Sequence, residues 1–449
     1  MKFWQWNERH MIGLKAGGRL KIIIAIVIFS VLILFHELGH FLLAKRNGII
    51  VDEFSLGMGP RIVSTVKGGT RYSLKLLPFG GSCLMRGEDG EEEGVGTFNG
   101  APVWGRISVV AAGPIFNFIL AFLVAVIVIG MVGYDPAEVT ALKENSPAAV
   151  AGLQEGDIIT RFNGSKIDIG RDMYNYEYLK GIDDQETTIE VCRDDKTLKI
   201  VYTPYSVDRY MLGFNYATPS ATEPAQVLNV KLNYPFAKAG IEAGDVITAI
   251  NDMEIASTED LDNYFKEHPL DQEEVKVSFD RKGKAKSVQV TPLSTTYVEM
   301  GFAYNMQRVK TSPLGVIKYS GIELKYWVKT TIQSLAMLVN GTVSVNELSG
   351  PVGVVDVIGD AYEESRSAGA LVTWMSIFNM MILLSVNLGV MNLLPVPALD
   401  GGRLIFLLIE AIRGKAINRQ AEGMIHFAGL MLLMVLLIYV TFHDIAKIF

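Results

Sequence analysis

The chain has 449 residues, 49% of them hydrophobic, and its mean hydropathy of +0.27 is high for a soluble protein. Its formal net charge is −7, so it lacks the basic character of nucleic-acid-binding proteins, and we expect no nucleic-acid partner. Apolar residues gather in long runs at both ends, with a polar block between them. This layout is typical of a membrane protein with several spans and a soluble insert. The two cysteines, Cys83 and Cys192, are too few for a disulfide framework.

The first long apolar run, from Ile22 to Leu43, follows a basic and aromatic extension at residues 1–20. As a helix this run is about 33 Å long, enough to cross the hydrocarbon core of a membrane. The apolar part of a secretory signal peptide is shorter and is followed by small residues at a cleavage site. We therefore predict a transmembrane helix that the mature protein keeps.

Three further apolar runs predict three more spans, at about residues 107–132, 371–394 and 424–441. The segment Leu314–Val339 is also apolar, but Lys318, Lys325 and Lys329 share one helical face and would be costly at the bilayer centre. We predict an amphipathic helix in the membrane interface there. Four spans place both termini on the same side of the membrane.

Residues 48–100, between the first two spans, are rich in glycine and turn-forming residues. Two strands are predicted for VDEFSLGMGPRIVSTV and TRYSLKLLPFGG, joined around Lys67-Gly68-Gly69. The acidic stretch GEDGEEEGVG that follows predicts a solvated loop.

The polar block between Gly133 and Pro313 contains an internal repeat. The segment NSPAAVAGLQEGDIITRFNGSKI from Asn145 aligns without gaps with NYPFAKAGIEAGDVITAINDMEI from Asn233, an offset of 233 − 145 = 88 residues. We predict two small domains in tandem, and the pattern resembles bacterial PDZ domains. Their Gly-hydrophobic strand has counterparts in Leu212-Gly213-Phe214 and Met300-Gly301-Phe302, but the opening strand of the first copy is hard to find in the sequence.

The first span contains His36, Glu37 and His40 in the pattern HExxH. Residues four apart share a helical face, so the two imidazoles can bind one ion, and Glu37 is placed to take a proton from metal-bound water. The alternative is a histidine pair satisfied by hydrogen bonds inside a helix bundle. Ionisable residues within a span are rare and functional by default, and a divalent cation offsets their cost. The pattern therefore predicts a zinc site.

A catalytic zinc site needs a third protein ligand and an open position for water. Asp400 follows a span and a helix break at Pro395 and Pro397, and irregular backbone at membrane depth requires protein or water around it. The alternative role for Asp400 is the N-cap of the next helix, and the two roles are compatible. His426, at the edge of the last span, is a weaker candidate, because a helix-end histidine near the headgroups explains it as well.

Taken together, the chain resembles the site-2 protease family, through HELGH in the first span, FSLGMGP and LPFGG before the second, AGPIFNFILA at its start, and NLLPVPALDGG after the third. With the PDZ pair it is most similar to the regulator-of-sigma-E protease branch, over nearly the whole chain. The resemblance implies a polytopic α-helical membrane protein with four transmembrane helices and a membrane-associated β-hairpin, plus two α+β PDZ domains. The expected parts are an extension, a first membrane part, two PDZ domains, an amphipathic linker and a second membrane part, at residues 1–20, 21–133, 134–207, 208–306, 307–369 and 370–449.

The resemblance also implies roles for individual residues. His36, His40 and Asp400 would bind one zinc ion, and Glu37 would be the general base. Asn392 would help to hold the substrate or the tetrahedral oxyanion, with a helix-terminating hydrogen bond as the alternative. The hairpin would dip into the membrane beside the metal and bind an unwound substrate as an added strand. Four glycines of its FSLGMGP and LPFGG segments are the expected substrate-binding positions, namely Gly57, Gly59, Gly80 and Gly81.

The function implied is that of an intramembrane zinc metalloprotease, which cleaves single-pass membrane proteins such as an anti-sigma factor, or remnant signal peptides, in or near their transmembrane segments. The PDZ pair would exclude bulky substrates or capture a new C-terminus. The expected location is the bacterial inner (plasma) membrane, with the PDZ pair extracytoplasmic and the active site toward the cytoplasm.

The charge pattern bears on this orientation in two ways. Seven Lys or Arg from Lys45 to Arg86 and four from Arg403 to Arg419 favour a cytoplasmic active-site face, whereas the basic residues from Lys2 to Lys21 favour the reverse.

Two rival functions are a catalytically silent PDZ scaffold and a metal transporter. The scaffold predicts loss of a site residue, and the transporter predicts polar residues along several spans.

Overall fold

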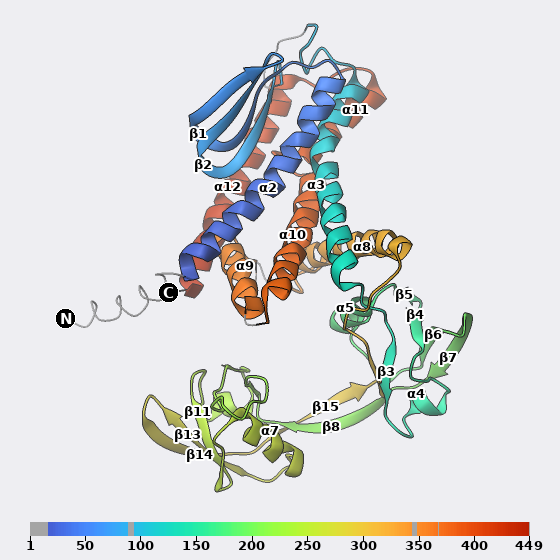
Figure 1. Ribbon diagram of the computed structural model, residues 1–449, viewed down its shortest axis with the longest axis vertical. Coiled ribbons are helices and arrows are strands. Elements are labelled where there is room, and N and C mark those ends of the chain that lie inside the picture. The colour runs from blue at the N-terminus through green and yellow to red at the C-terminus, as the bar shows by residue number, and fades with distance from the viewer. Residues whose placement is uncertain (1–16, 89–93, 344–347, 367, 449) are drawn as a thin grey trace, which may run out of the picture. The chain divides into compact units, whose positions relative to one another are not determined.

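The computed structural model describes residues 17–88, 94–343, 348–366 and 368–448 (Figure 1). Most of the expected extension at 1–20 and part of the acidic loop lie outside these residues. The chain forms two compact units, one built from residues 1–135 and 307–449 and the other from Pro136–Met306. The first contains the apolar helices and the second the internal repeat.

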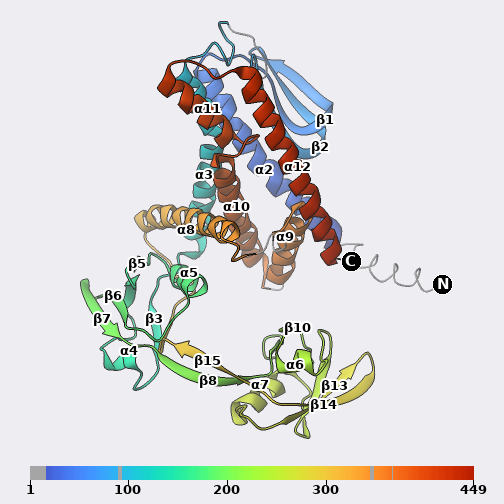
Figure 2. The same ribbon diagram turned by 180° about the vertical axis from the view of Figure 1, so that it is seen from behind.

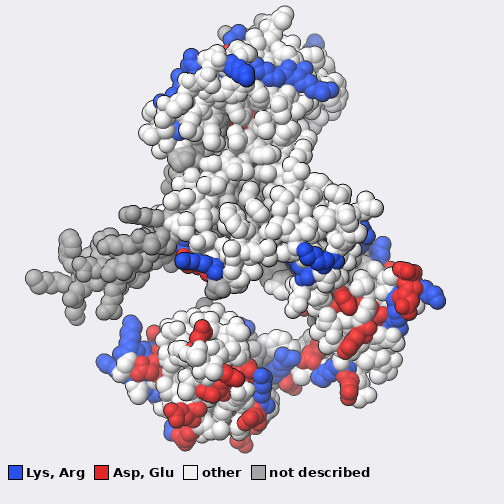
Figure 3. All heavy atoms as spheres, in the orientation of Figure 1, with Lys and Arg blue, Asp and Glu red and all other residues white. Residues whose placement is uncertain are grey.

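Four helices in the described part of the chain have the length and hydropathy of membrane spans. They are α2 (Gly17–Arg46), α3 (Val103–Val132), α10 (Ala370–Leu393) and α12 (Arg419–Ile448). The four predicted spans are thus confirmed as long apolar helices. In Figure 3, the surface over the middle of these helices is nearly free of charged side chains on the face in view, and Lys and Arg gather at the end with α11 and the hairpin.

The helices α2, α3 and α10 pack around a shared apolar core that includes Leu32, Ala121 and Val386. Two further helices, α8 (Pro313–Val339) and α9 (Pro351–Arg366), pack on the same core. The helix predicted at 314–339 therefore forms, and it runs across α3 and α10 rather than alongside them (Figures 1 and 2). The Thr331 hydroxyl of α8 donates a hydrogen bond of 2.6 Å to Asn387 of α10. Such polar contacts hold helices together where lipid removes the hydrophobic driving force.

The hairpin consists of β1 (Val51–Lys67) and β2 (Thr70–Met85), close to the predicted strands. Both strands bend, so that β1 residues 51–56 pair with β2 twice, once with residues 71–74 and once with residues 81–85. Gly57 and Gly80 lie at the bends with φ angles of +87° and +83°, which glycine adopts without strain. The sheet therefore has four segments, and residues 81–85 form one of its edges.

The insert contains two copies of one fold. In the first, the sheet order is β5-β4-β6-β7, and in the second it is β12-β11-β13-β14. The first copy comprises β3 (Val139–Leu142), α4 (Pro147–Val150), β4 (Ile158–Phe162), β5 (Ser165–Lys166), α5 (Gly170–Lys180), β6 (Thr187–Arg193) and β7 (Lys196–Tyr202). The second comprises β9 (Phe214–Asn215), β10 (Asn229–Val230), α6 (Pro235–Lys238), β11 (Val246–Ile250), β12 (Met253–Glu254), α7 (Thr258–Glu267), β13 (Val275–Arg281) and β14 (Lys284–Val290).

The second copy is inserted into the first. A two-stranded ribbon of β8 (Tyr205–Met211) and β15 (Leu293–Glu299) leads out to the second copy and back. The strand that follows, β16 (Phe302–Tyr304), pairs with β3, and Phe302 and Tyr304 pack on the core of the first copy. The predicted division into 134–207 and 208–306 differs from this arrangement. The opening strand of the first repeat is supplied by β16, directly after Met300-Gly301. Strand pairing over so long a separation leaves no local signal of which copy the strand completes.

Candidate metal centre

Helix α2 presents His36 and His40 on one face, one turn apart. Their Nε2 atoms are 3.2 Å apart, and the rings meet edge to face with centroids 4.8 Å apart. Both side chains are shielded, with exposed fractions of 11% and 10%. Two imidazole nitrogens therefore converge on one point inside an otherwise apolar helix bundle.

Asp400 reaches the same point from the other end of the chain. After α10 ends at Leu393, the backbone turns through Pro395 and Pro397, and α11 (Asp400–Arg413) begins. Asp400 Oδ2 lies 3.2 Å from His36 Nε2 and 3.5 Å from His40 Nε2. The N-cap of α11 is Leu399, so the alternative that Asp400 caps this helix is wrong. As the first helical residue, Asp400 instead directs its carboxylate toward the histidines.

The glycines after Asp400 make this turn compact. A Cβ on Gly401 would lie 2.1 Å from the carbonyl oxygen of Leu394, and one on Gly402 would lie 2.5 Å from that of Val396. Both distances are far below van der Waals contact, so any side chain at either position would push α11 away from the end of α10. The Asp-Gly-Gly sequence thus fixes where the carboxylate is presented.

The outer nitrogens of both imidazoles have partners on α3. His40 Nδ1 is 2.9 Å from the Val109 carbonyl oxygen, which can only accept, so Nδ1 carries the proton and Nε2 offers a lone pair. The structure places Nδ2 of the Asn117 amide 3.1 Å from His36 Nδ1. An amide can present either its oxygen or its nitrogen there, and with the oxygen facing Nδ1 the second imidazole also offers Nε2. Asn117 Oδ1 is otherwise buried without a hydrogen-bond partner in the described residues.

Close contact between α2 and α3 depends on two glycines. A Cβ on Gly39 would lie 2.4 Å from the Ala112 carbonyl oxygen, and one on Gly113 would lie 2.3 Å from His40 Nε2. Small residues let membrane helices approach closely, and here they bring the α3 backbone against the histidine face. Gly113 therefore also forms the part of α3 that lies directly against the two imidazoles.

The three side chains fit a divalent cation. Their ligand atoms all lie within 4.8 Å of one another, and among the described residues they form the one group of this kind. Asp400 Oδ2 is buried without a hydrogen-bond donor, although it faces two imidazoles. A carboxylate and two neutral imidazoles are a donor set that zinc prefers, and three protein ligands leave a position for water.

Glu37 lies beside this cluster and next to the hairpin. A Cβ on Gly81 would be 3.1 Å from Glu37 Cγ and 3.1 Å from the Ser55 carbonyl oxygen, so a side chain there would need its neighbours to shift by a few tenths of an ångström. Of the four predicted glycines, the structure places Gly81 at the site. Gly57, Gly59 and Gly80 have positive φ angles and form the bends that carry Gly81 there.

Two other candidates lie near the turn but outside the cluster. Asn392 is half-buried at the end of α10. His426 of α12 is not among the grouped ligands, and its Nδ1 accepts a hydrogen bond of 2.9 Å from the backbone N–H of Ala398. Sequence reasoning missed the contributions of Asn117 and Gly113. The signal for Asn117 was its polarity within an apolar span.

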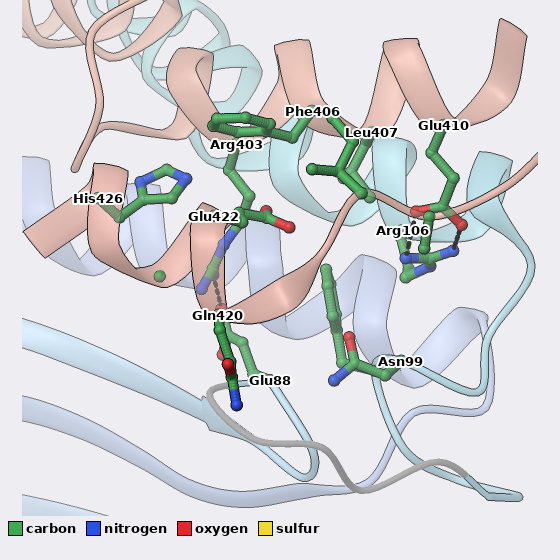
Figure 4. Close-up of a pocket in the computed structure, with 14 residues that line it drawn as sticks. Glu88, Asn99, Arg106, Arg403, Phe406, Leu407, Glu410, Gln420, Glu422 and His426 are labelled. Carbon is green, nitrogen blue, oxygen red and sulfur yellow. Dashed lines mark hydrogen bonds and ion pairs between the residues drawn. The ribbon is translucent and has the colours of Figure 1, made fainter. Parts of the chain in front are cut away.

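A pocket of about 400 Å³ lies between α11, the first turns of α12 and the segment that contains Glu88 and Phe98 (Figure 4). Two ion pairs line it, Arg403 with Glu88 and Arg106 with Glu410. Figure 4 shows His426 at the end of this pocket next to Arg403. Polar side chains thus line the space beside the Asp400 turn.

Comparison with known proteins decides the family. The profile of peptidase family M50 matches residues 24–436. The chain belongs to peptidase family M50. It is 33% identical to the zinc metalloprotease RasP of Geobacillus kaustophilus, over 95% of this chain and 98% of that protein. It is also 29% identical to the regulator of sigma-W protease RasP of Bacillus subtilis (95% and 99%) and 30% identical to the regulator of sigma-E protease RseP of Salmonella typhimurium (94% and 98%).

Among solved structures, the PDZ domain of HtrA3 bound to a phage-derived ligand aligns with 21% of this chain and 93% of that chain, at 16% identity and a TM-score of 0.18. The M50 membership confirms the predicted family, the enzyme class and the zinc cofactor. This M50 chain is an intramembrane zinc metalloprotease, and the prediction of a silent scaffold loses its support.

Proposed function

We propose that His36, His40 and Asp400 hold the zinc ion of this M50 peptidase and that Glu37 is its general base. The observation that carries the proposal is the convergence of three ligand atoms within 4.8 Å, from two helices more than three hundred residues apart in the chain. Bound zinc would polarise the scissile carbonyl and lower the pKa of a water molecule to near neutrality.

Glu37 would accept the proton of the attacking water and deliver it to the leaving amine. Val109 and Asn117 would hold the two imidazoles in the tautomer that offers Nε2. Asn392, at the end of the helix that leads to Asp400, would hydrogen-bond the substrate backbone or the developing oxyanion. Each of these tasks needs a fixed side chain, and the two imidazoles are fixed by their partners on α3.

The hairpin edge at residues 81–85 would bind the substrate as an added strand. A peptide bond inside a helix is shielded, so the substrate must be extended before water can attack it. Edge strands offer unpaired backbone groups to such a segment. Support for this edge comes from Gly81, which lies against both Glu37 and Ser55.

The two repeats would be extracytoplasmic PDZ domains that control access to the membrane site. Each copy has a four-stranded sheet and two helices in the same order, and the glycines at 213 and 301 have positive φ before a short strand. They would act as a size filter or capture a newly exposed C-terminus. The substrates would be single-pass membrane proteins of the anti-sigma factor type, or remnant signal peptides, in the plasma membrane of a bacterium.

The decisive experiment is Glu37→Gln in the detergent-purified chain, with zinc content and cleavage of a transmembrane substrate measured on the same preparation. We expect about one zinc per chain to be retained and cleavage to fall by at least about 100-fold, because general-base catalysis contributes on that order. Asp400→Asn is the companion variant and should lose zinc. Undiminished cleavage by Glu37→Gln would overturn the assignment of the base.

A further inference from the structure

The turn that presents Asp400 contains an unfavourable backbone conformation. Ala398 has a φ of +78°, in the left-handed region where a Cβ crowds the following carbonyl. Most other non-glycine residues with positive φ in the described chain are Asn or Asp, which tolerate this region. Ala398 has no such side chain, so its conformation must be held from outside.

The holding contact comes from the last membrane span. The backbone N–H of Ala398 donates a hydrogen bond of 2.9 Å to His426 Nδ1 on α12. One turn further along α12, a Cβ on Gly429 would lie 2.5 Å from the Pro397 carbonyl oxygen, so the helix backbone itself presses on the turn. His426 and Gly429 thus contact the two residues at the bend, two or three positions before Asp400.

The hydrogen bond also settles the state of the imidazole. Nδ1 accepts from Ala398, so it carries no proton and cannot also bind a metal. The other nitrogen, Nε2, is buried with no hydrogen-bond partner among the described residues, and a cavity of about 290 Å³ between the turn and α12 is lined by Asp400, Arg403 and His426. The ring itself packs beside Phe406 of α11, with centroids 5.5 Å apart.

We propose that His426 is a positioning residue of the protease: its Nδ1 holds Ala398 in the left-handed conformation and thereby fixes the Asp400 carboxylate where it meets His36 and His40. The inference rests on the proposed role of Asp400 as a zinc ligand. Without the acceptor, the turn relaxes toward negative φ, and the carboxylate leaves the histidine pair. The last span therefore belongs to the metal centre, although it contributes no ligand.

The test compares four variants of the full chain in detergent: His426→Ala, His426→Asn, His426→Gln, and His426→Ala combined with Ala398→Gly. Asparagine places its oxygen where Nδ1 lies, whereas glutamine places its oxygen one bond further out, near the position of Nε2. Zinc affinity is measured by competition with a chelating dye, independently of activity, and kcat and KM are measured on a transmembrane substrate. Circular dichroism and gel filtration check that each variant is folded.

We expect His426→Ala and His426→Gln to weaken zinc binding by about 10-fold or more, as loss of outer partners of metal ligands does, and to lower kcat with KM unchanged. His426→Asn should recover most of the affinity. Ala398→Gly in the His426→Ala background should improve zinc binding, because glycine adopts positive φ without strain.

Wild-type zinc affinity in His426→Ala would overturn the proposal, and so would equal defects in the Asn and Gln variants. Failure of Ala398→Gly to improve the His426→Ala protein would show that the turn is not what His426 holds. Asp400→Asn separates this inference from the proposed function. If that variant binds zinc normally, the ligand assignment has failed; if it loses zinc while His426→Ala does not, only the role of His426 has failed.

Discussion

At the scale of single residues, one carboxylate-guanidinium contact occurs twice in the insert. Asp157 binds Arg193 at 2.6 Å and Asp245 binds Arg281 at 2.7 Å, and both aspartates also accept from the backbone three residues before them. The offset between the two contacts is again 245 − 157 = 88 residues. The repeat seen in the sequence is thus a repeat of side-chain chemistry.

Asp245→Ala should therefore destabilise the second copy. It removes the acceptor of a backbone N–H and of a guanidinium from a site where the carboxylate is 2% exposed, and we expect the free energy of unfolding to fall by about 2 kcal/mol. This loss of free energy is measured by hydrogen exchange of the β11 and β13 amides in the full chain. Lys276→Met is the matched control on β13, because its partner Asp252 is 80% exposed and such pairs contribute about 0.5 kcal/mol or less. Equal exchange in the two variants would contradict the prediction.

The hairpin contains a carboxyl group whose pKa is displaced. Arg61, 2.9 Å away, holds the pKa of the buried Glu53 carboxyl at about 2 instead of 4.5, with Lys75 adding to the effect. Because the folded pKa is lowered, this contact stabilises the hairpin above about pH 4.5, and the stabilisation is lost as the pH falls toward 2. Carbon-13 titration of the Glu53 carboxyl checks the value. Arg61→Met should move the midpoint up, and a wild-type midpoint near 4.5 would refute the interpretation.

At the scale of elements, the centre depends on how closely α2 and α3 approach. This contact needs glycine at two positions. Helix α3 then contributes three groups to the centre, namely the Val109 carbonyl, the Asn117 amide and the backbone at Gly113. The hairpin and α11 then approach the same face of α2 from other directions. A change in the spacing of two helices therefore acts directly on the ligands.

Gly113→Ala tests this dependence. The added Cβ would lie 2.3 Å from His40 Nε2 and 2.7 Å from His36 Cε1, so the imidazoles must move, and we expect zinc affinity and cleavage to fall by about 10-fold or more. Gly130→Ala on the same helix is the control, because its Cβ would meet nothing nearer than Val316 Cγ1 at 4.0 Å. The test is to measure the zinc affinity of the Gly113→Ala and Gly130→Ala proteins. Similar losses in the two would point to a general effect of alanine on α3.

At the scale of the whole molecule, the proposed function divides chemistry and control of access between the two units. The metal centre lies in the helical unit, and the repeated domains form the other unit. Basic residues are frequent in the segment after α2 and in the one after α10, which the positive-inside rule places in the cytoplasm. The insert would then lie outside.

Cysteine labelling tests this orientation in a background with Cys83 and Cys192 replaced by alanine. Val150→Cys in the insert and Ile412→Cys in α11 are 78% and 85% exposed positions. A membrane-impermeant maleimide should label the first in spheroplasts and the second only after the membrane is broken. Labelling in the opposite order would invert the topology and would make the basic residues before α2 the dominant signal.

Patterns that are local in the chain were readable without a structure. Apolar runs gave the four spans, because a bilayer demands about twenty apolar residues in sequence. The HExxH spacing gave His36, Glu37 and His40, and a broken helix after a span pointed to Asp400. The 88-residue offset gave the repeated domains. Each of these depends on neighbours in sequence, where periodicity and composition are informative.

Contacts between distant segments were decided only by the tertiary structure. Strand β16 completes a domain that begins more than one hundred and fifty residues earlier, and although Gly301-Phe302 indicated a strand, no local pattern shows which copy it joins. The sequence supplied the proposed ligands of a metal centre, but the α3 groups that contact its imidazoles, and the α12 histidine proposed to hold the turn before Asp400, emerge from packing alone. The physical reason is that the sequence encodes the identity of each side chain residue by residue. The direction in which a side chain points, and its distance from groups on other helices, are set by how the helices pack.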